Sequence, residues 1–205
     1  IGARCIPELK IYFLLVSDFL LDVSKSNDEK YLISLKNKFL IQRTFSISKI
    51  PSIILESESI FLLTDFLLNQ NALFDKTQTI IVKKAFKIHE NNTRLTLDDI
   101  ADKVTLTRER VRQIRNTCLD ELFNKLSFIK NLSNDLLQKY NIDIDSNQIE
   151  INSETIERIN NTENTNLSKE FIIYLLYVYV SERFSLIGNV EDVLLHKHIT
   201  ARNRY

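Results

Sequence analysis

The sequence predicts a mainly α-helical protein, and three observations carry that prediction. Gly2 and Gly188 are the only glycines among 205 residues, so few tight turns are expected. Apolar residues, 44% of the chain, recur at spacings of three and four through most of it. Several of these apolar runs begin just after a Ser, Thr or Asp that can cap a helix. We expect a helical N-terminal part at 1–72, a central helix-turn-helix at 73–130 and a smaller mixed α/β part at 131–205.

The N-terminal part is expected to hold three helices. They span residues 11–23, 31–45 and 53–69, separated by a polar loop at 24–29 and a break around Pro51. The first, IYFLLVSDFLL at its core, is densely apolar and is therefore predicted to be largely buried. A membrane span needs about 20 apolar residues, so this run is too short to be one.

Asp75 can cap a further helix that leads into the central motif. Four of its apolar side chains are expected to face inward: Ile80, Ile81, Ala85 and Ile88. Three lysines are expected to face water as solubilising charge: Lys83, Lys84 and Lys87.

The central motif has two capped helix starts, eleven residues apart. Thr96 and Asp99 have the spacing of a capping box, with Leu95 and Ile100 as a hydrophobic staple. Thr107 repeats the cap, and Leu106 and Val111 repeat the staple. Two starts this close leave only a short connection, which is typical of a helix-turn-helix.

The second of these helices should have two faces. One face is apolar and packs against the first helix, where Ala101 is small enough for the two helices to cross closely. The apolar residues of the two helices and their connection are Ile100, Val104, Leu106, Val111, Ile114, Cys118, Leu119 and Leu122. The other face of the second helix is expected to expose Arg108, Glu109, Arg112, Gln113 and Asn116 to solvent.

Charge is concentrated on this second helix. Residues 108–115 hold four arginines and one glutamate, a local charge of 4 − 1 = +3 in a chain whose formal net charge is zero. A basic face of this kind can bind the phosphate backbone of DNA. Arg, Gln and Glu side chains can also hydrogen-bond to base edges in the major groove. A solvated helix with mixed charge is the alternative interpretation.

The segment TLDDIADKVTLTRERVRQI, residues 96–114, resembles region 4 of bacterial RNA polymerase sigma factors, and the resemblance extends over residues 75–130. It implies a module that docks in the promoter's −35 element and contacts RNA polymerase. It places base reading on Arg108, Glu109 and Gln113, and DNA backbone contacts on Arg94, Thr96, Thr107 and Arg112.

Two positions depart from that family's pattern. Arg115 stands where the family usually has glutamate; it adds a positive charge and a further expected backbone contact. Thr105 occupies the turn where glycine is common. A β-branched residue there would be strained by about 1–2 kcal/mol at positive φ, which favours a differently shaped turn.

The N-terminal segment IGARCIPELKIYF, with Gly2 and Pro7, resembles the second half of the helix-hairpin-helix in the C-terminal domain of RNA polymerase alpha subunits. A generic capped helix explains the same residues. Both interpretations stay open.

The C-terminal part mixes strand and helix patterns. Alternating isoleucines at 142, 144, 149 and 151 indicate one or two short strands, or a wing as in winged-helix proteins, before a short helix at 153–160. Ser168 can cap FIIYLLYVYV, which we interpret as a core helix, with a partner-binding surface as the alternative. Residues 184–187 are a predicted strand entering a turn, and EDVLLHKHI is a last amphipathic helix or an extension.

Catalytic, metal and cofactor signals are absent from the sequence. Too few glycines exclude glycine-rich phosphate loops, and His196 and His198 have no third ligand nearby. Cys5 and Cys118 suggest no disulfide framework, and Cys118 fits a buried face. No signal peptide or membrane span is visible, so a reducing cytoplasm is expected.

These observations predict a non-enzymatic, sequence-specific binder of double-stranded DNA in transcription regulation, with RNA polymerase core as a second partner. Whether it is a true sigma factor or a regulator with a borrowed module, and its oligomeric state, stay open. A chain without methionine suggests part of a longer protein. The alternatives are a module that docks RNA polymerase or another protein without reading DNA, and the DNA anchor of an enzyme whose active site lies elsewhere.

Overall fold

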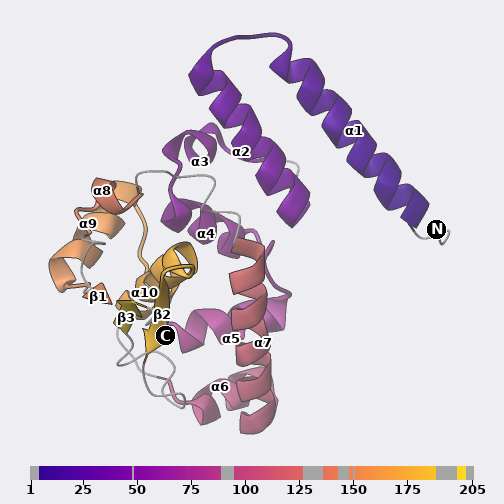
Figure 1. Cartoon of the computed structure of the whole chain (residues 1–205). Coiled ribbons are helices and arrows are strands. Elements are labelled where there is room, and N and C mark those ends of the chain that lie inside the picture. The colour runs from indigo at the N-terminus through magenta and orange to yellow at the C-terminus, as the bar shows by residue number, and fades with distance from the viewer. Residues whose placement is uncertain are drawn as a thin grey trace. The chain divides into compact units, whose positions relative to one another are not determined.

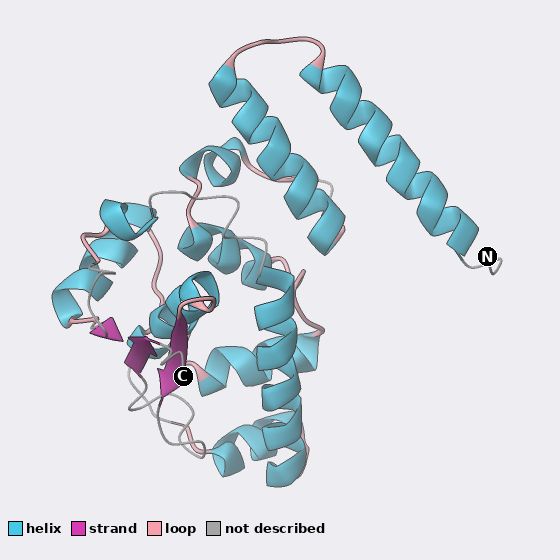
Figure 2. Cartoon of the chain, in the orientation of Figure 1, coloured by secondary structure: helices cyan, strands magenta, loops and turns pink. Residues whose placement is uncertain are grey.

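The computed structural model describes residues 5–47, 49–88, 95–126, 136–142, 148–149, 151–187 and 198–201. It is mainly helical, as predicted (Figure 2). The chain divides into two compact units, Ile1–Glu58 and Ser59–Tyr205. Figure 1 labels their helices and strands.

The first unit contains α1 (Cys5–Val23), α2 (Glu29–Phe45) and α3 (Ser52–Ser57). Asp28 caps α2 by accepting a hydrogen bond from the backbone N–H of Lys30 at 3.3 Å. α1 packs against α2, with the ring centroids of Phe19 and Phe39 4.7 Å apart. α1 and α2 therefore form a helical hairpin.

The prediction that the first helix is largely buried is wrong. None of the residues of α1 is buried. α2 covers one side of α1, whereas the apolar residues of α1 surround nearly its whole circumference. Six of them define what we call the outer face of α1: Ile6, Leu9, Phe13, Leu14, Leu20 and Leu21.

The predicted helix at 53–69 is two helices. Its first part is α3, and its second part is α4 (Ile60–Asn69), which opens the second unit. Glu58 takes a left-handed backbone conformation, with φ 51°, and ends α3. Ser59 then caps α4 by accepting from the N–H of Leu62.

The second unit continues with six helices in its described residues. They are α5 (Lys76–Ala85), α6 (Leu97–Val104), α7 (Arg108–Leu126), α8 (Leu136–Lys139), α9 (Ser153–Glu163) and α10 (Lys169–Val180). The predicted helix at 153–160 is thus confirmed as α9 and is one turn longer.

The core of the second unit is built on α10. Ser168 caps it, as predicted, by accepting from the N–H of Phe171 at 3.2 Å. Most of its apolar run is buried against neighbours that include α4 and α9. Phe171 stacks edge-on against Phe86, with ring centroids 5.1 Å apart. The interpretation of FIIYLLYVYV as a core helix is therefore the one that the burial supports.

Three short strands form an antiparallel sheet of order β1-β3-β2 that packs on α10 (Figure 1). They are β1 (Gln148–Ile149), β2 (Phe184–Ile187) and β3 (His198–Ala201). The predicted strand at 184–187 is confirmed. The end of EDVLLHKHI is extended, since His198 and Ile199 belong to β3. Residues 188–197 and Ile144 lie outside the described residues.

The two-unit division differs from the predicted boundaries at 72/73 and 130/131. The predicted boundary at 72/73 places α4 in the N-terminal part, but α4 packs against α9 and α10. Long-range packing decides this grouping. None of the helices in the described ranges has the length and apolarity that crossing a lipid bilayer would require.

Candidate nucleic-acid interface

α5, α6 and α7 pack on one another around a small apolar cluster. Its buried members are Ile81, Ile100, Ala101 and Val111, and partly buried residues such as Ala85, Val104, Leu106 and Ile114 pack against them. The predicted apolar faces of α6 and α7 are confirmed by this cluster. Ala101 is 4% exposed at the predicted crossing position.

The prediction for α5 is wrong at Ile80, and the three lysines expected to face water, Lys83, Lys84 and Lys87, are only partly exposed. Ile81 and Ile88 are buried, as expected, but Ile80 is 42% exposed. The buried stripe of α5 runs through Ile81, Val82 and Phe86, at spacings of one and four. Ile80 lies off that stripe.

The start of α6 is a capping box, as predicted. Thr96 Oγ1 accepts from the N–H of Asp99 at 3.2 Å, and Asp99 Oδ2 accepts from the N–H of Thr96 at 2.7 Å. The backbone hydrogen bond from Thr96 is the main cause that lowers the pKa of Asp99. Leu95 packs against the apolar cluster that contains Ile100, which agrees with the predicted staple.

Three residues, 105–107, join α6 to α7. Thr105 has φ 56° and ψ 44°, so the left-handed turn forms and the expectation of a different turn shape is wrong. The N–H of Leu106 donates to the carbonyl of Ala101 at 3.0 Å, and that of Thr105 donates to Asp102. These bonds, with Leu106 packed on the cluster, hold Thr105 in place despite its β-branch.

The first turn of α7 is capped by Thr107, as predicted. Thr107 Oγ1 accepts from the N–H of Arg110 at 3.2 Å, and the N–H of Val111 donates to the carbonyl of Thr107 at 3.0 Å. An N-cap of this kind satisfies a backbone donor that would otherwise have no partner.

The C-terminal half of α7 is tied to the rest of the second unit. Tyr174 donates its hydroxyl hydrogen to the carbonyl of Leu119 at 2.7 Å, and Lys125 Nζ donates to the carbonyl of Leu73 at 2.7 Å. Cys118 is fully buried, as predicted, and burial raises the pKa of its thiol to about 12. This anchoring leaves the first turns of α7 as the exposed end.

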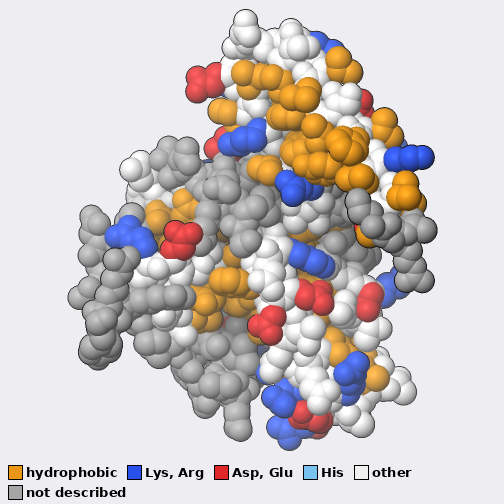
Figure 3. Space-filling view, turned by 45° about the vertical axis from the view of Figure 1, so that its right-hand side comes forward, with side chains coloured by type: hydrophobic (Ala, Val, Ile, Leu, Met, Phe, Trp, Pro, Cys, Tyr) orange, Lys and Arg blue, Asp and Glu red, His pale blue; other side chains and the backbone are white. Residues whose placement is uncertain are grey.

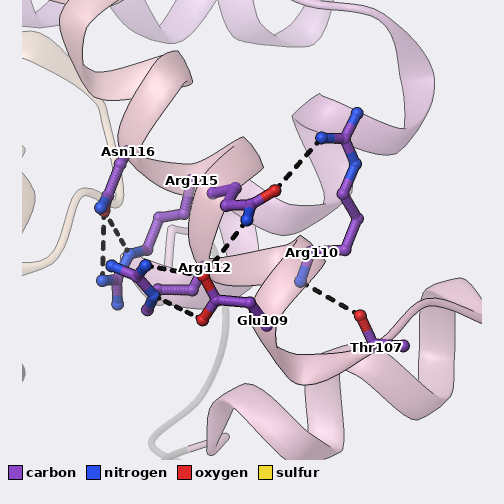
Figure 4. Close-up of polar contacts among 7 residues, drawn as sticks. Thr107, Glu109, Arg110, Arg112, Arg115 and Asn116 are labelled. Carbon is purple, nitrogen blue, oxygen red and sulfur yellow. Dashed lines mark hydrogen bonds and ion pairs between the residues drawn. The ribbon is translucent and has the colours of Figure 1, made fainter.

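Those first turns carry a chain of polar side chains (Figure 4). Arg112 donates to Glu109 through Nε at 2.8 Å and NH2 at 2.7 Å. Gln113 Nε2 donates to Glu109 at 3.2 Å and its Oε1 accepts from Arg110 at 3.4 Å. Arg108 Nε lies 3.9 Å from Asp98 Oδ2 on α6. The predicted base-reading residues Arg108, Glu109 and Gln113 therefore share one exposed surface.

Electrostatics keeps this surface ionised. The hydrogen bond from Arg112 is the main cause that lowers the pKa of Glu109 to about 2. The side chains of Arg108, Glu109 and Arg112 are 67, 58 and 49% exposed. At neutral pH the first turns of α7 thus present three exposed arginines, Arg110 included, and one glutamate.

Arg115 is expected to contact a DNA phosphate, which requires an exposed guanidinium, but this residue is buried. It is 7% exposed, and its guanidinium donates to Asn116 Oδ1 at 3.3 and 3.4 Å. Val111, Arg115, Cys118 and Leu122 fall on one buried stripe of α7, which is the physical reason. Asn116, predicted to point outward, is half-buried.

Arg110 contributes to the positive charge of residues 108–115, but the resemblance to sigma region 4 implies no contact for it. The structure exposes Arg110 within hydrogen-bond reach of Gln113. The position of Arg110 in TRERVRQI, two residues after Arg108, is the sequence feature that could have indicated its place on this surface. Arg94 lies outside the described residues. Within the described ranges, no group of three or more His, Cys, Asp or Glu residues could hold a metal ion.

Comparison of the chain with protein-family models, with curated proteins and with solved structures gave no match. The function proposed below therefore rests on the site's own residues.

Proposed function

We propose that α6, the turn at 105–107 and α7 form a helix-turn-helix, and that the protein binds double-stranded DNA sequence-specifically in transcription. One observation carries the proposal. α7 has one side packed in an apolar cluster, while its first two turns expose Arg108, Glu109 and Gln113 together on the other.

The major groove of B-DNA is about 12 Å wide and admits one helix. The exposed end of α7 is capped and locally basic, whereas the opposite end is held by Tyr174 and Lys125. A helix fixed at one end can enter a groove without losing much conformational entropy, which supports this docking mode.

In this proposal Arg108, Glu109 and Gln113 face base edges, because Arg suits guanine, Gln suits adenine and Glu accepts from cytosine. Arg112, Thr96 and Thr107 contact phosphates, the two threonines at helix N-termini where the partial charge is positive. Arg94 keeps its predicted backbone role. Arg115 is left out because it is buried.

Promoter −35 recognition and contact with RNA polymerase belong to the proposal through the resemblance of residues 96–114 to sigma region 4. A wing is not part of it, because the sheet of β1, β2 and β3 packs on α10. The protein acts here by binding, without chemistry of its own.

The test is selection of bound duplexes from a random DNA pool, followed by salt-titrated affinity on the enriched sequence and on scrambled DNA. A specific reader binds the enriched site at least about a thousandfold tighter. Gln113→Ala should then cost about 1–3 kcal/mol on that site and relax one base preference.

Arg112→Ala should weaken binding to scrambled DNA and reduce the salt slope by about one. On the enriched site it should also change the preference at the base that Glu109 reads, because Arg112 no longer holds that carboxylate. Lys169→Ala is the matched control, since it removes an exposed cation at the start of α10. If no sequence is enriched, or if Gln113→Ala and Lys169→Ala behave identically, the recognition-helix assignment is wrong.

A second candidate is docking on RNA polymerase or another protein. α6 exposes Asp98, Asp99 and Asp102 beside the arginines of α7, and Arg112 is paired with Glu109. Such alternating charge suits a protein surface that carries both signs. Retained capture of polymerase core by variants that lose DNA binding would favour this candidate.

A further inference from the structure

Of the eleven exposed large hydrophobic residues among the described ones, eight lie on α1, and six of these form its outer face. Its six side chains are 46 to 65% exposed. Figure 3 shows hydrophobic side chains gathered over the hairpin of α1 and α2. Burying such residues is the main source of stability in water, so a face like this favours a covering surface.

The helical period puts the six residues on one side. Ile6, Phe13 and Leu20 repeat every seven residues, and so do Leu14 and Leu21. Positions seven apart lie almost above one another on an α-helix. The side that faces α2 is marked by Phe19, whose ring contacts Phe39. The outer face is thus a mostly apolar stripe, with Lys10 and Ser17 among the six residues, and such a stripe can pack against another helix.

The exposed apolar area of α1 is large enough to form the centre of an interface. Each of the six residues is 46 to 65% exposed, and Phe13 alone can bury roughly 150–250 Å² when it is fully covered. A standard-size protein interface buries ~800 Å² on each partner. The stripe and residues at its rim such as Ile11 supply the apolar part of such an interface.

Two charges, Lys10 within this stripe and Asp18 at its edge, suit a second copy of the chain. Lys10 and Asp18 lie four residues on either side of Leu14, the middle residue of α1. In an antiparallel pair of α1 helices centred on Leu14, Lys10 of each copy is level with Asp18 of the other. The opposite signs favour this pairing, and a two-fold axis covers both stripes at once.

We propose that the protein forms a homodimer in which the outer faces of two α1 helices pack antiparallel, centred on Leu14. This inference is independent of DNA binding. It assigns a role to the apolar N-terminal helix that the candidate nucleic-acid interface does not use.

The experiment is sedimentation equilibrium of the full chain and of two matched variants. Leu14→Glu and Ile53→Glu each replace an apolar side chain of a residue that is 65% exposed, the first in the stripe and the second on α3. Circular dichroism should show unchanged helix content in both, because neither residue is buried.

The wild-type protein and Ile53→Glu should sediment at twice the 24.0 kDa of one chain, and Leu14→Glu at the monomer mass. Two like charges beside the two-fold axis should raise the dissociation constant by about tenfold or more. In a Cys5→Ser background, Leu14→Cys should form an intermolecular disulfide on oxidation, and Ile53→Cys should not.

A monomeric wild-type protein at every concentration would overturn the proposal, and binding to lipid vesicles or burial of the stripe within one chain would then explain the face. A dimer that survives Leu14→Glu, or that Ile53→Glu also abolishes, would place the contact elsewhere and overturn it equally.

Discussion

Arg112 holds the carboxylate of Glu109 through two parallel hydrogen bonds, from Nε at 2.8 Å and from NH2 at 2.7 Å. Both residues lie on the exposed side of α7, three positions apart. The pair means that Glu109 is not a free acceptor before a ligand arrives. Any reading of a cytosine by Glu109 must therefore compete with Arg112, and Glu109 also orients the guanidinium.

The first prediction concerns the ionisation of Glu109. Its pKa lies at about 2, below the ordinary value of 4.5, chiefly because Arg112 donates to it. A lowered pKa means that the pair contributes fully above pH 4.5 and is lost as the pH falls through about 2. Carbon-13 NMR of the Glu109 carboxyl should show this titration.

Arg112→Ala is the paired variant for that experiment. It removes the main cause of the shift, so the pKa of Glu109 should return toward 4.5. An unchanged titration in Arg112→Ala would contradict the assignment of the shift to this pair.

The second prediction concerns the turn between α6 and α7. Thr105 has φ 56°, a region that costs a β-branched residue about 1–2 kcal/mol. Thr105→Gly removes this strain but gains entropy in the unfolded chain, so a net stabilisation of about 0.5–1 kcal/mol is expected. Urea unfolding measures the change.

Thr105→Ala is the control, because alanine keeps the Cβ and most of the strain. It should stabilise less than glycine does. Equal stability of the two variants would show that the side chain, not the backbone conformation, sets the energy at this position.

The third prediction compares two tyrosines buried in the second unit. Tyr140 donates its hydroxyl hydrogen to Glu163, whose side chain is 3% exposed and also accepts from Lys139 at 2.6 Å. Tyr174 donates instead to a neutral acceptor, the carbonyl of Leu119. Burial is the main cause that raises the pKa of both hydroxyls, so both stay protonated as donors at neutral pH.

Tyr140→Phe should lower the free energy of unfolding by about 1.5–3 kcal/mol and Tyr174→Phe by about 0.5–1.5 kcal/mol, because hydrogen bonds to charged groups are stronger. Chemical denaturation of both variants checks the order. A larger loss in Tyr174→Phe would mean that Glu163 finds other partners when Tyr140 is removed.

The fourth prediction concerns the two thiols. Cys5 is exposed and Cys118 is buried, with its pKa raised to about 12 by burial. Only a thiolate reacts readily with iodoacetamide, so the native protein should be modified at Cys5 and the denatured protein at both. Mass spectrometry of the digested protein distinguishes the sites. Rapid modification of Cys118 in native conditions would show that the core around α7 opens.

Local features of the site were predictable from the sequence. The caps at Thr96, Thr107 and Ser168 each bind a backbone N–H three residues further along the chain. Interactions of such short range are encoded in adjacent residues, and the periodic apolar faces of α6 and α7 follow from the same helical geometry.

The errors share a different origin. The charge of Arg115 predicts a phosphate contact, yet its side chain lies on the buried stripe of α7. The hydrophobicity of Ile80 predicts an inward position, yet this residue is 42% exposed because α5 is covered on its other side. The residue type indicates whether a side chain is more stable buried or exposed to water. The packing of neighbouring helices and strands decides whether it is in fact buried.

By itself, the sequence determined where most helices begin, that the protein is mainly helical, and that one helix carries clustered arginines. Only the tertiary structure decided that α4 belongs with α9 and α10, that Arg112 is paired with Glu109, and that the outer face of α1 is exposed. The start of a helix depends on contacts within one turn. Burial depends on contacts between residues that are distant in the chain, and a local sequence pattern does not predict those contacts.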